Sequence, residues 1–335
     1  MPRTAARHAL IRVVLAVVAI ASLGVVAAAS AQARVPRDDA RIVARIAPPG
    51  GAAHLAMGPK GRYLWTVASK ANLLTPIEVA DNSVATGTAI PPGLQSGVAL
   101  ATNGRTAYLS YSSKRMVAVV DLRSGRVNAR IDVGRRPGGI AVSPDGRQVY
   151  VSCWGDQSVF VISTASNRVL AEIPVRGRPD ALAFAPDGRR AYVASLSEDL
   201  VSVIDTRSRR EVGMIASPSP NALAVSPDGT RLFVSSVVPD DRLFAIDTTS
   251  LVAVASLGLP DRPESLVVSP DSTRVYLAMK GLGVVDARSL SFLGTIPLDG
   301  KAMTHVAVGP DGTRAYATNA GRYVYVVDVA GYAGP

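Results

Sequence analysis

Hydrophobic residues recur at every second position in short runs across most of the chain, which is the periodicity of β-strands with one buried face. Four such runs follow one another in mid-chain: GIAVS (139–143), RQVYVS (147–152), SVFVIS (158–163) and RVLAEI (168–173). The SPDG turn between the first two suits a tight reversal, because Pro presets φ, Asp hydrogen-bonds its own backbone and Gly accepts a positive φ. This stretch predicts four antiparallel strands, here called A to D in chain order.

The same unit recurs along the chain with a period near 42 residues. Seven turns of the SPDG type mark it, at 58–61, 101–104, 143–146, 185–188, 226–229, 269–272 and 309–312. A period of this length that carries only β signals indicates a propeller of four-stranded blades. We therefore predict an all-β, seven-bladed β-propeller of four-stranded antiparallel blades over residues 40–330, followed by a short tail at 331–335.

The two ends of the repeat array are incomplete in complementary ways. RIVARI (41–46) resembles the D strand RVNARI (126–131), and Ile46 precedes Pro59 by 13 residues, just as Ile131 precedes Pro144. The last repeat has strands A to C but only VAGYAGP after them. We predict that the N-terminal strand completes the last blade and closes the ring, because an open blade edge would pair with other chains.

The first residues follow a different pattern. Arg3, Arg7 and Arg12 precede an apolar run over 13–29, and Ala-Ser-Ala at 29–31 offers a small-x-small cleavage site, with Ala-Gln-Ala at 31–33 as a second choice. This order is typical of a secretory signal peptide. We predict a signal peptide at residues 1–31 and a periplasmic or secreted protein without a transmembrane segment after cleavage. An uncleaved anchor is the alternative, but the run is short for a membrane span.

Charge and cysteine content narrow the class of partner. The sequence has 36 Lys and Arg against 26 Asp and Glu, a formal net charge of +10, which favours acidic partners. The basic residues are spread along the chain without a basic run, so no strong nucleic-acid motif is present. The single cysteine, Cys153, excludes an internal disulfide, and an exported protein without one depends on its packed core. Whether Cys153 cross-links two chains stays open.

The B strands share a further motif. It reads YVSC at 150–153, YVAS at 192–195, FVSS at 233–236, YLAM at 276–279 and YATN at 316–319. With the SPDG turn and the C strand VSVID (201–205), this makes the chain resemble the WD40-like YVTN-repeat β-propellers, exported proteins of bacteria and archaea. The resemblance implies a binding or surface module. Blade one departs from it, because LWTVA (64–68) matches poorly and its D strand carries extra residues at 82–90.

Motifs of the enzymes that use propellers are largely missing from the sequence. There is no Cys-x-x-Cys-His for a c-type haem, no Gly-x-Ser-x-Gly, no His-Glu-x-x-His and no Gly-rich phosphate loop. We therefore expect a non-catalytic binding module with no cofactor, no metal and no catalytic residue. The alternative is a propeller enzyme of the lactonase type or a periplasmic protein associated with haem d1 or a cytochrome. A lactonase stays open because the site residues of such enzymes are scattered around the channel mouth.

Function is expected where the repeats differ. A four-stranded blade places its variable B–C and D–A loops on one face, here called the loop face, and its uniform A–B and C–D turns on the other, the turn face. Aligned strand-A starts place His54 and His305 at equivalent positions of adjacent blades at the channel mouth. Two imidazoles there could hold a metal or meet an anion, but two ligands are too few for a structural metal site. We expect both histidines to titrate near neutral pH unless burial or a partner moves them.

Further polar residues are expected around the same mouth. They are Arg136, Arg178 and Arg262, with Asp180, Asn221 and Glu264 between these arginines and the A strands. Trp154, on a B–C loop, is either an exposed contact residue or a plug that packs against the next blade. The arginines favour an anionic ligand, so the predicted partner is a protein or an anionic small molecule or polymer that binds the loop face.

Overall fold

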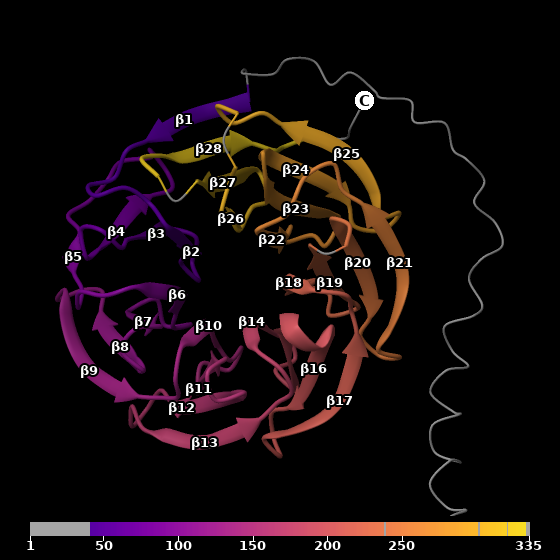
Figure 1. The fold of residues 1–335 in the computed structure, drawn as a ribbon. Coiled ribbons are helices and arrows are strands. Elements are labelled where there is room, and N and C mark those ends of the chain that lie inside the picture. Colours follow the sequence, from indigo (N-terminus) through magenta and orange to yellow (C-terminus); the bar gives the residue numbers. More distant parts are fainter. Residues whose placement is uncertain (1–40, 238, 301, 320, 333–335) are drawn as a thin grey trace, which may run out of the picture. The chain divides into compact units, whose positions relative to one another are not determined.

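Each sequence repeat forms one four-stranded antiparallel sheet in the computed structural model, which describes residues 41–332 except 238, 301 and 320. The seven sheets stand around a central axis as blades, and the first strand of each blade lies innermost (Figure 1). The predicted seven-bladed propeller is therefore confirmed. The predicted signal peptide lies outside the described residues and stays a prediction. No helix in the described part of the chain is long and apolar enough to cross a membrane.

The strands follow the predicted order A to D in each blade. Blade one has β2 (His54–Met57), β3 (Tyr63–Ala68), β4 (Leu73–Glu78) and β5 (Thr88–Ala89); blade two has β6 (Gln95–Leu100), β7 (Thr106–Tyr111), β8 (Met116–Asp121) and β9 (Arg126–Asp132). Blade three has β10 (Pro137–Val142), β11 (Gln148–Cys153), β12 (Ser158–Ser163) and β13 (Val169–Pro174); blade four has β14 (Pro179–Phe184), β15 (Arg190–Ser195), β16 (Leu200–Asp205) and β17 (Arg210–Ala216). Blade five has β18 (Pro220–Val225), β19 (Arg231–Ser236), β20 (Arg242–Asp247) and β21 (Val252–Gly258); blade six has β22 (Ser265–Val268), β23 (Arg274–Met279), β24 (Gly281–Asp286) and β25 (Ser291–Ile296). Blade seven has β26 (His305–Val308), β27 (Arg314–Thr318), β28 (Val324–Asp328) and β1 (Ile42–Ile46), and a short 3-10 helix, η2 (Leu196–Glu198), follows β15.

The hydrophobic core lies between neighbouring blades. Trp65 and Leu74 of blade one pack with Leu109 and Tyr111 of blade two in one cluster of buried side chains. The second and third strands of each blade are almost wholly buried because both of their faces meet a neighbouring blade, whereas most outer strands alternate between exposed and covered residues. Alternating apolar residues therefore hold each blade to the next.

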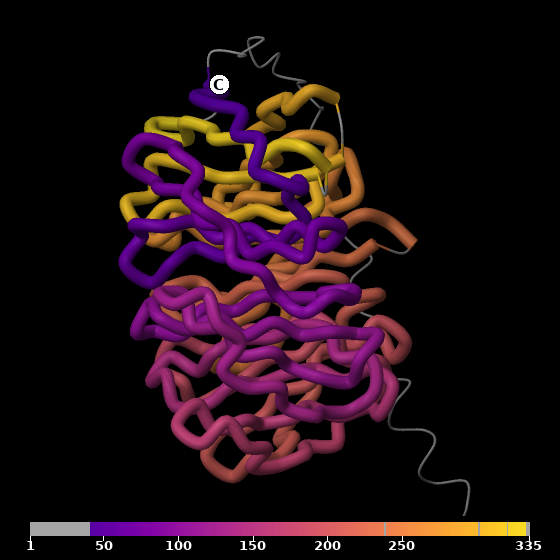
Figure 2. The backbone as a smooth tube through the Cα atoms, turned by 90° about the vertical axis from the view of Figure 1, so that its left-hand side faces the viewer, coloured from indigo at the N-terminus to yellow at the C-terminus, as the bar shows by residue number. Residues whose placement is uncertain are grey.

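The ring closes with the N-terminal strand, as predicted. β1 pairs antiparallel with β28, with Ile46 opposite Val324, and the sheet order is β1-β28-β27-β26. In the side view, the indigo strand lies along the yellow end of the chain (Figure 2). Ile46 is 7% exposed and packs with residues of blades one and seven. The last blade thus has its fourth strand, and β28 has no open edge.

Blade one departs from the repeat where the sequence does. The chain after β4 turns at Asn82, whose φ of 62° is left-handed, and one isolated bridge joins Ile77 to Val84. The outer strand β5 then has two residues. The extra residues at 82–90 therefore leave most of this edge without a regular strand.

The repeated aspartates serve the turns. Asp145 accepts hydrogen bonds from the Ser143 hydroxyl and the backbone N–H of Arg147. Asp205, at the end of a C strand, accepts from the backbone N–H and hydroxyl of Ser208. These hydrogen bonds favour the ionised carboxylates and lower the pKa of both residues. The repeated aspartates on the turn face therefore use their carboxylates to stabilise the turns.

Candidate functional site

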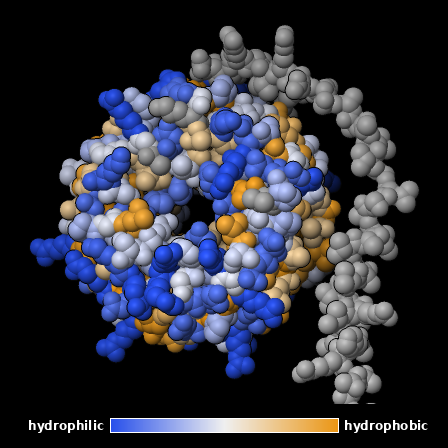
Figure 3. Space-filling view, in the orientation of Figure 1, coloured by the Kyte–Doolittle hydropathy of each residue, from blue (hydrophilic) through white to orange (hydrophobic). Residues whose placement is uncertain are grey.

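The inner strands surround a central cavity of about 410 Å³. Its lining comes from all seven blades, and the space-filling view shows the hollow at the centre of the ring (Figure 3). The predicted site residues that line it are His54, Asp180, Asn221, Glu264 and His305. All of them lie at the start of an A strand or directly before it, because the inner strand of each blade begins at the channel.

His54 and His305 are in direct contact across the closing seam of the ring. The Nδ1 atom of His54 lies 3.0 Å from the Nε2 atom of His305, and the two rings meet edge to face with centroids 4.5 Å apart. The Nε2 atom of His54 lies 3.1 Å from the carbonyl oxygen of Gln95. Since that carbonyl can only accept, His54 carries its proton on Nε2, and its Nδ1 accepts from the Nε2–H of His305.

Burial keeps this histidine pair neutral. It lowers the pKa of His54, although the Gln95 carbonyl acts in the opposite direction. Burial, together with the neighbouring His54, lowers the pKa of His305 to about 3. The sequence predicted titration of both histidines near neutral pH unless burial or a partner moved their pKa values, and burial does lower both pKa values. The two rings share one hydrogen bond. The described residues contain no group of three or more His, Cys, Asp or Glu able to hold a metal.

Acidic and amide side chains line the channel away from the histidines. Asp180 is exposed to the channel, yet the walls around its carboxyl group raise its pKa, with a backbone hydrogen bond from Gly139 opposing this. Asn221 donates to the carbonyl oxygen of Pro263 at 3.0 Å. Arg262 forms an ion pair with Glu264 at 2.9 Å. The positive charge of Arg262, which was predicted to bind an anion, is therefore already neutralised by Glu264.

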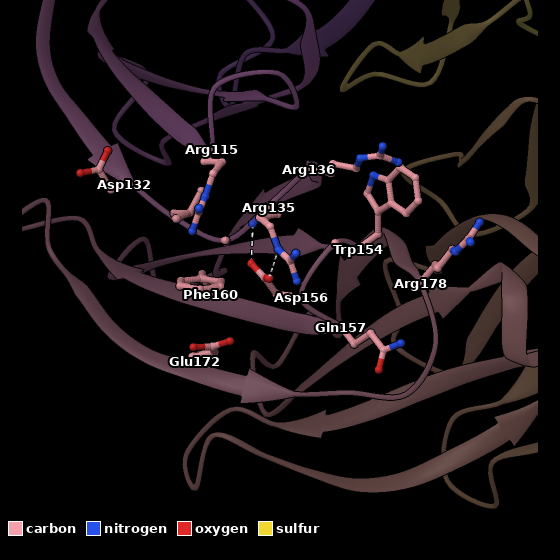
Figure 4. Close-up of a pocket in the computed structure, with 13 residues that line it drawn as sticks. Arg115, Asp132, Arg135, Arg136, Trp154, Asp156, Gln157, Phe160, Glu172 and Arg178 are labelled. Atoms are coloured by element: carbon pink, nitrogen blue, oxygen red, sulfur yellow. Dashed lines mark hydrogen bonds and ion pairs between the residues drawn. The ribbon is translucent and has the colours of Figure 1, made fainter.

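Two of the predicted arginines and the tryptophan lie elsewhere on the loop face. Arg136, Trp154 and Arg178 line a cleft of about 940 Å³ at the junction of blades two, three and four (Figure 4). Arg136 has a left-handed φ of 53°, and its carbonyl accepts the backbone N–H of Trp154 at 3.3 Å. The D–A loop and the B–C loop of blade three thus hold each other. The backbone N–H of Arg178 is fixed by the hydroxyl of Ser197 at 3.1 Å.

Trp154 organises the inner end of this cleft. The guanidinium carbon of Arg136 lies 4.2 Å from an indole ring centroid, and that of Arg178 lies 5.2 Å from it. Both distances are within the range of cation–π attraction. Trp154 is half-buried and contacts Arg178 of the loop that enters blade four, so it packs against the next blade while part of its side chain stays accessible.

Some cleft residues were not among the sequence candidates. They are Arg115, Asp132, Arg135, Asp156, Gln157, Phe160 and Glu172. Asp156 and Gln157 belong to a B–C loop whose sequence differs from blade to blade, and this variation could have identified them as site candidates. Asp132 and Glu172 lie on outer strands, where an isolated charge resembles any solvent-facing residue, so the sequence carried no signal for them.

Cys153 is fully buried at the end of β11, beside the same cleft. Burial raises the pKa of its thiol to about 12. A buried thiol of this kind is neither accessible nor ionised at neutral pH. Cys153 therefore does not cross-link two folded chains.

Comparison with known proteins supports the fold and leaves the function open. No protein-family model and no curated protein matches the chain. Among solved structures, the chain is similar to the hydrazine synthase of Kuenenia stuttgartiensis, at 22% identity over 84% of this chain and 96% of that chain, with a TM-score of 0.75. It is also similar to the Cps50 (Swd1) β-propeller domain of Myceliophteria thermophila, at 14% identity over 86% of this chain and 99% of that chain, with a TM-score of 0.76. At these identities the likeness shows the propeller fold alone.

Proposed function

We propose that this chain is an exported, non-catalytic β-propeller of the YVTN-repeat type that binds a negatively charged partner through its loop face. Export is supported by the charged, apolar and small-residue order of residues 1–31. The YVTN-type assignment is supported by the repeated B-strand motif and its fixed distance from the SPDG turn. Binding through the loop face is supported by the B–C loops, which differ between blades, whereas most A–B turns keep the Pro-Asp pair of the SPDG pattern.

The observation that carries the proposal is the cluster formed by Arg136, Trp154 and Arg178. Its two guanidinium groups are held beside one indole ring, and no carboxylate of the described residues lies within 4 Å of either. Arg135 and Arg262, in contrast, are paired with nearby carboxylates. Guanidinium groups that are positioned but unpaired suit carboxylate, sulfate or phosphate groups of a partner.

The channel supports the proposal less well than the cleft. His54 and His305 hydrogen-bond to each other and are kept neutral by burial, so they offer an anion no positive charge, and Asp180 and Glu264 add negative charge to the walls. An anion in the channel would therefore face carboxylates without an unpaired cation beside them. The cleft is the better place for an anionic partner.

The test measures binding of labelled anionic polymers: polyglutamate, polygalacturonate, dextran sulfate and polyphosphate. Fluorescence anisotropy with the signal-free protein gives an affinity for each. The variant R136A/R178A should weaken the tightest complex by about ten- to a hundredfold, because a hydrogen bond to a charged group contributes about 1.5–3 kcal/mol. Binding should also weaken as salt rises.

The matched control removes the same charge from the turn face. Arg147 and Arg189 are exposed and follow the SPDG and APDG turns. R147A/R189A should bind like the parent protein. If this control weakens binding as much as R136A/R178A does, the attraction comes from net charge and the loop-face assignment is wrong.

A further inference from the structure

The cleft beside Trp154 changes character along its length. Blade three is ordered β10-β11-β12-β13 from the channel outward. Arg136 precedes the inner strand and Trp154 follows β11, whereas Phe160 lies on β12 and Glu172 on the outer β13. Asp132 ends the outer strand of blade two. Figure 4 shows this sequence from Arg178 and Trp154 at one end to Phe160, Glu172 and Asp132 at the other.

The two ends carry opposite charge. Arg136 and Arg178 give the inner end two positive charges, while Asp132 and Glu172 lie at the outer end with Arg115, which offsets one of them. None of these five residues has an ion-pair partner within 4 Å in the part of the chain that the structure describes. These charged side chains are too far apart to pair with one another, so they can bind oppositely charged groups of a ligand or be hydrated by water.

The middle of the cleft is close to neutral. Arg135 forms an ion pair with Asp156 at 2.6 Å, and the half-buried ring of Phe160 lies beside it. Gly134 lets the loop approach this ring, because a Cβ there would lie 2.6 Å from the Phe160 side chain. Glu172 is opposite Phe160 in the strand register, so the apolar surface passes directly into the acidic end.

We infer that this cleft binds an extended polypeptide segment that places an acidic residue beside Arg136 and Arg178, an apolar side chain over Phe160 and a basic residue beside Asp132 and Glu172. This inference rests on the proposed function and specifies its partner. A uniform polyanion would meet like charge at the outer end, and a small anion would leave that end unused. Side chains of alternating chemistry along one chain are the property of a peptide.

The size of the cleft agrees with such an occupant. Its volume of about 940 Å³ lies near the upper limit of typical small-ligand sites, roughly 300–1,000 Å³. A segment of several residues therefore fits. The exposed charges at both ends would determine the direction and register of the bound segment more than its affinity.

The experiment is selection from a displayed library of random heptapeptides on the signal-free protein. Enriched peptides should carry Asp or Glu toward one end and Lys or Arg toward the other. Selection on the variant E172K should lose the basic preference and keep the acidic one, and selection on R178A should weaken the acidic preference. The control D240K makes the same charge change at an exposed residue of a blade-five loop and should give the parent pattern.

Synthetic peptides from the selection give the affinities. E172K should weaken the parent-selected peptide by about two- to fivefold, because an exposed ion pair contributes at most about 1 kcal/mol. Enrichment of purely acidic peptides, or a basic preference that E172K leaves unchanged, would overturn the inference while the proposed function stands. The same holds if no peptide is enriched but the labelled polymers bind through Arg136 and Arg178. If neither peptides nor polymers bind, both are wrong.

Discussion

Removing the buried side chain of the closing strand should destabilise the whole ring. Ile46 is 7% exposed and packs with Leu64, Ile77 and Tyr316 at the seam of blades one and seven. Replacing a buried Ile by Ala costs about 2–5 kcal/mol, since apolar contacts are lost and a cavity remains. For a domain of this size 1 kcal/mol corresponds to about 2–4 °C in Tm. We therefore expect I46A to melt about 4–20 °C lower.

The same strand provides the matched control. Val43 is 48% exposed and belongs to the outward face of β1. V43A should change the free energy of unfolding by no more than about 0.5 kcal/mol. Differential scanning fluorimetry and urea unfolding followed by circular dichroism would compare the two variants. If I46A and V43A melt at the same temperature, the N-terminal strand does not hold the ring closed, and the seam must be stabilised by other contacts.

Three further predictions concern processing, the thiol and pH. N-terminal sequencing of exported protein should show cleavage after Ala31 or Ala33, and an intact N-terminus would contradict the signal peptide. Cys153 should resist a thiol reagent in the folded protein and react fully in urea, and rapid labelling of the folded protein would contradict its burial. His305 has a folded-state pKa far below its unfolded value of about 6.5, so unfolding takes up protons and stability falls as pH drops from about 6.5 toward 3. The parent should lose about 1–3 kcal/mol more between pH 7 and pH 4.5 than H305Q does in urea unfolding, and equal losses would contradict the neutral buried pair.

The fold was predictable because every blade repeats the same local chemistry. The turn Asp and Gly residues, the alternating strands and the 13-residue offset from Ile46 to Pro59 all depend on near neighbours in sequence. The contact of His54 with His305 also followed, since strand-A starts are equivalent by symmetry and the ring closes.

The division of the site was not predictable in the same way. Arg136, Arg178 and Arg262 all precede a proline near an A strand and look equivalent in sequence. Their surroundings differ because Arg136 and Arg178 lie over the Trp154 ring in the cleft, whereas Arg262 pairs with Glu264. The contact of Trp154 with Arg178 joins loops of neighbouring blades, and a repeat pattern carries no information about it.

The central claim, that an anionic partner binds beside Trp154, is tested most directly by the fluorescence of that residue. The sequence has two tryptophans, and Trp65 is buried in the core between blades one and two, so the W65F protein reports from Trp154 alone. Titration with the tightest-binding polymer or peptide should shift its emission saturably, with the affinity given by anisotropy, and R136A/R178A should move the shift to about ten- to a hundredfold higher concentrations. If the ligand binds with that affinity and the emission of Trp154 does not change, the partner occupies another surface and the account is contradicted.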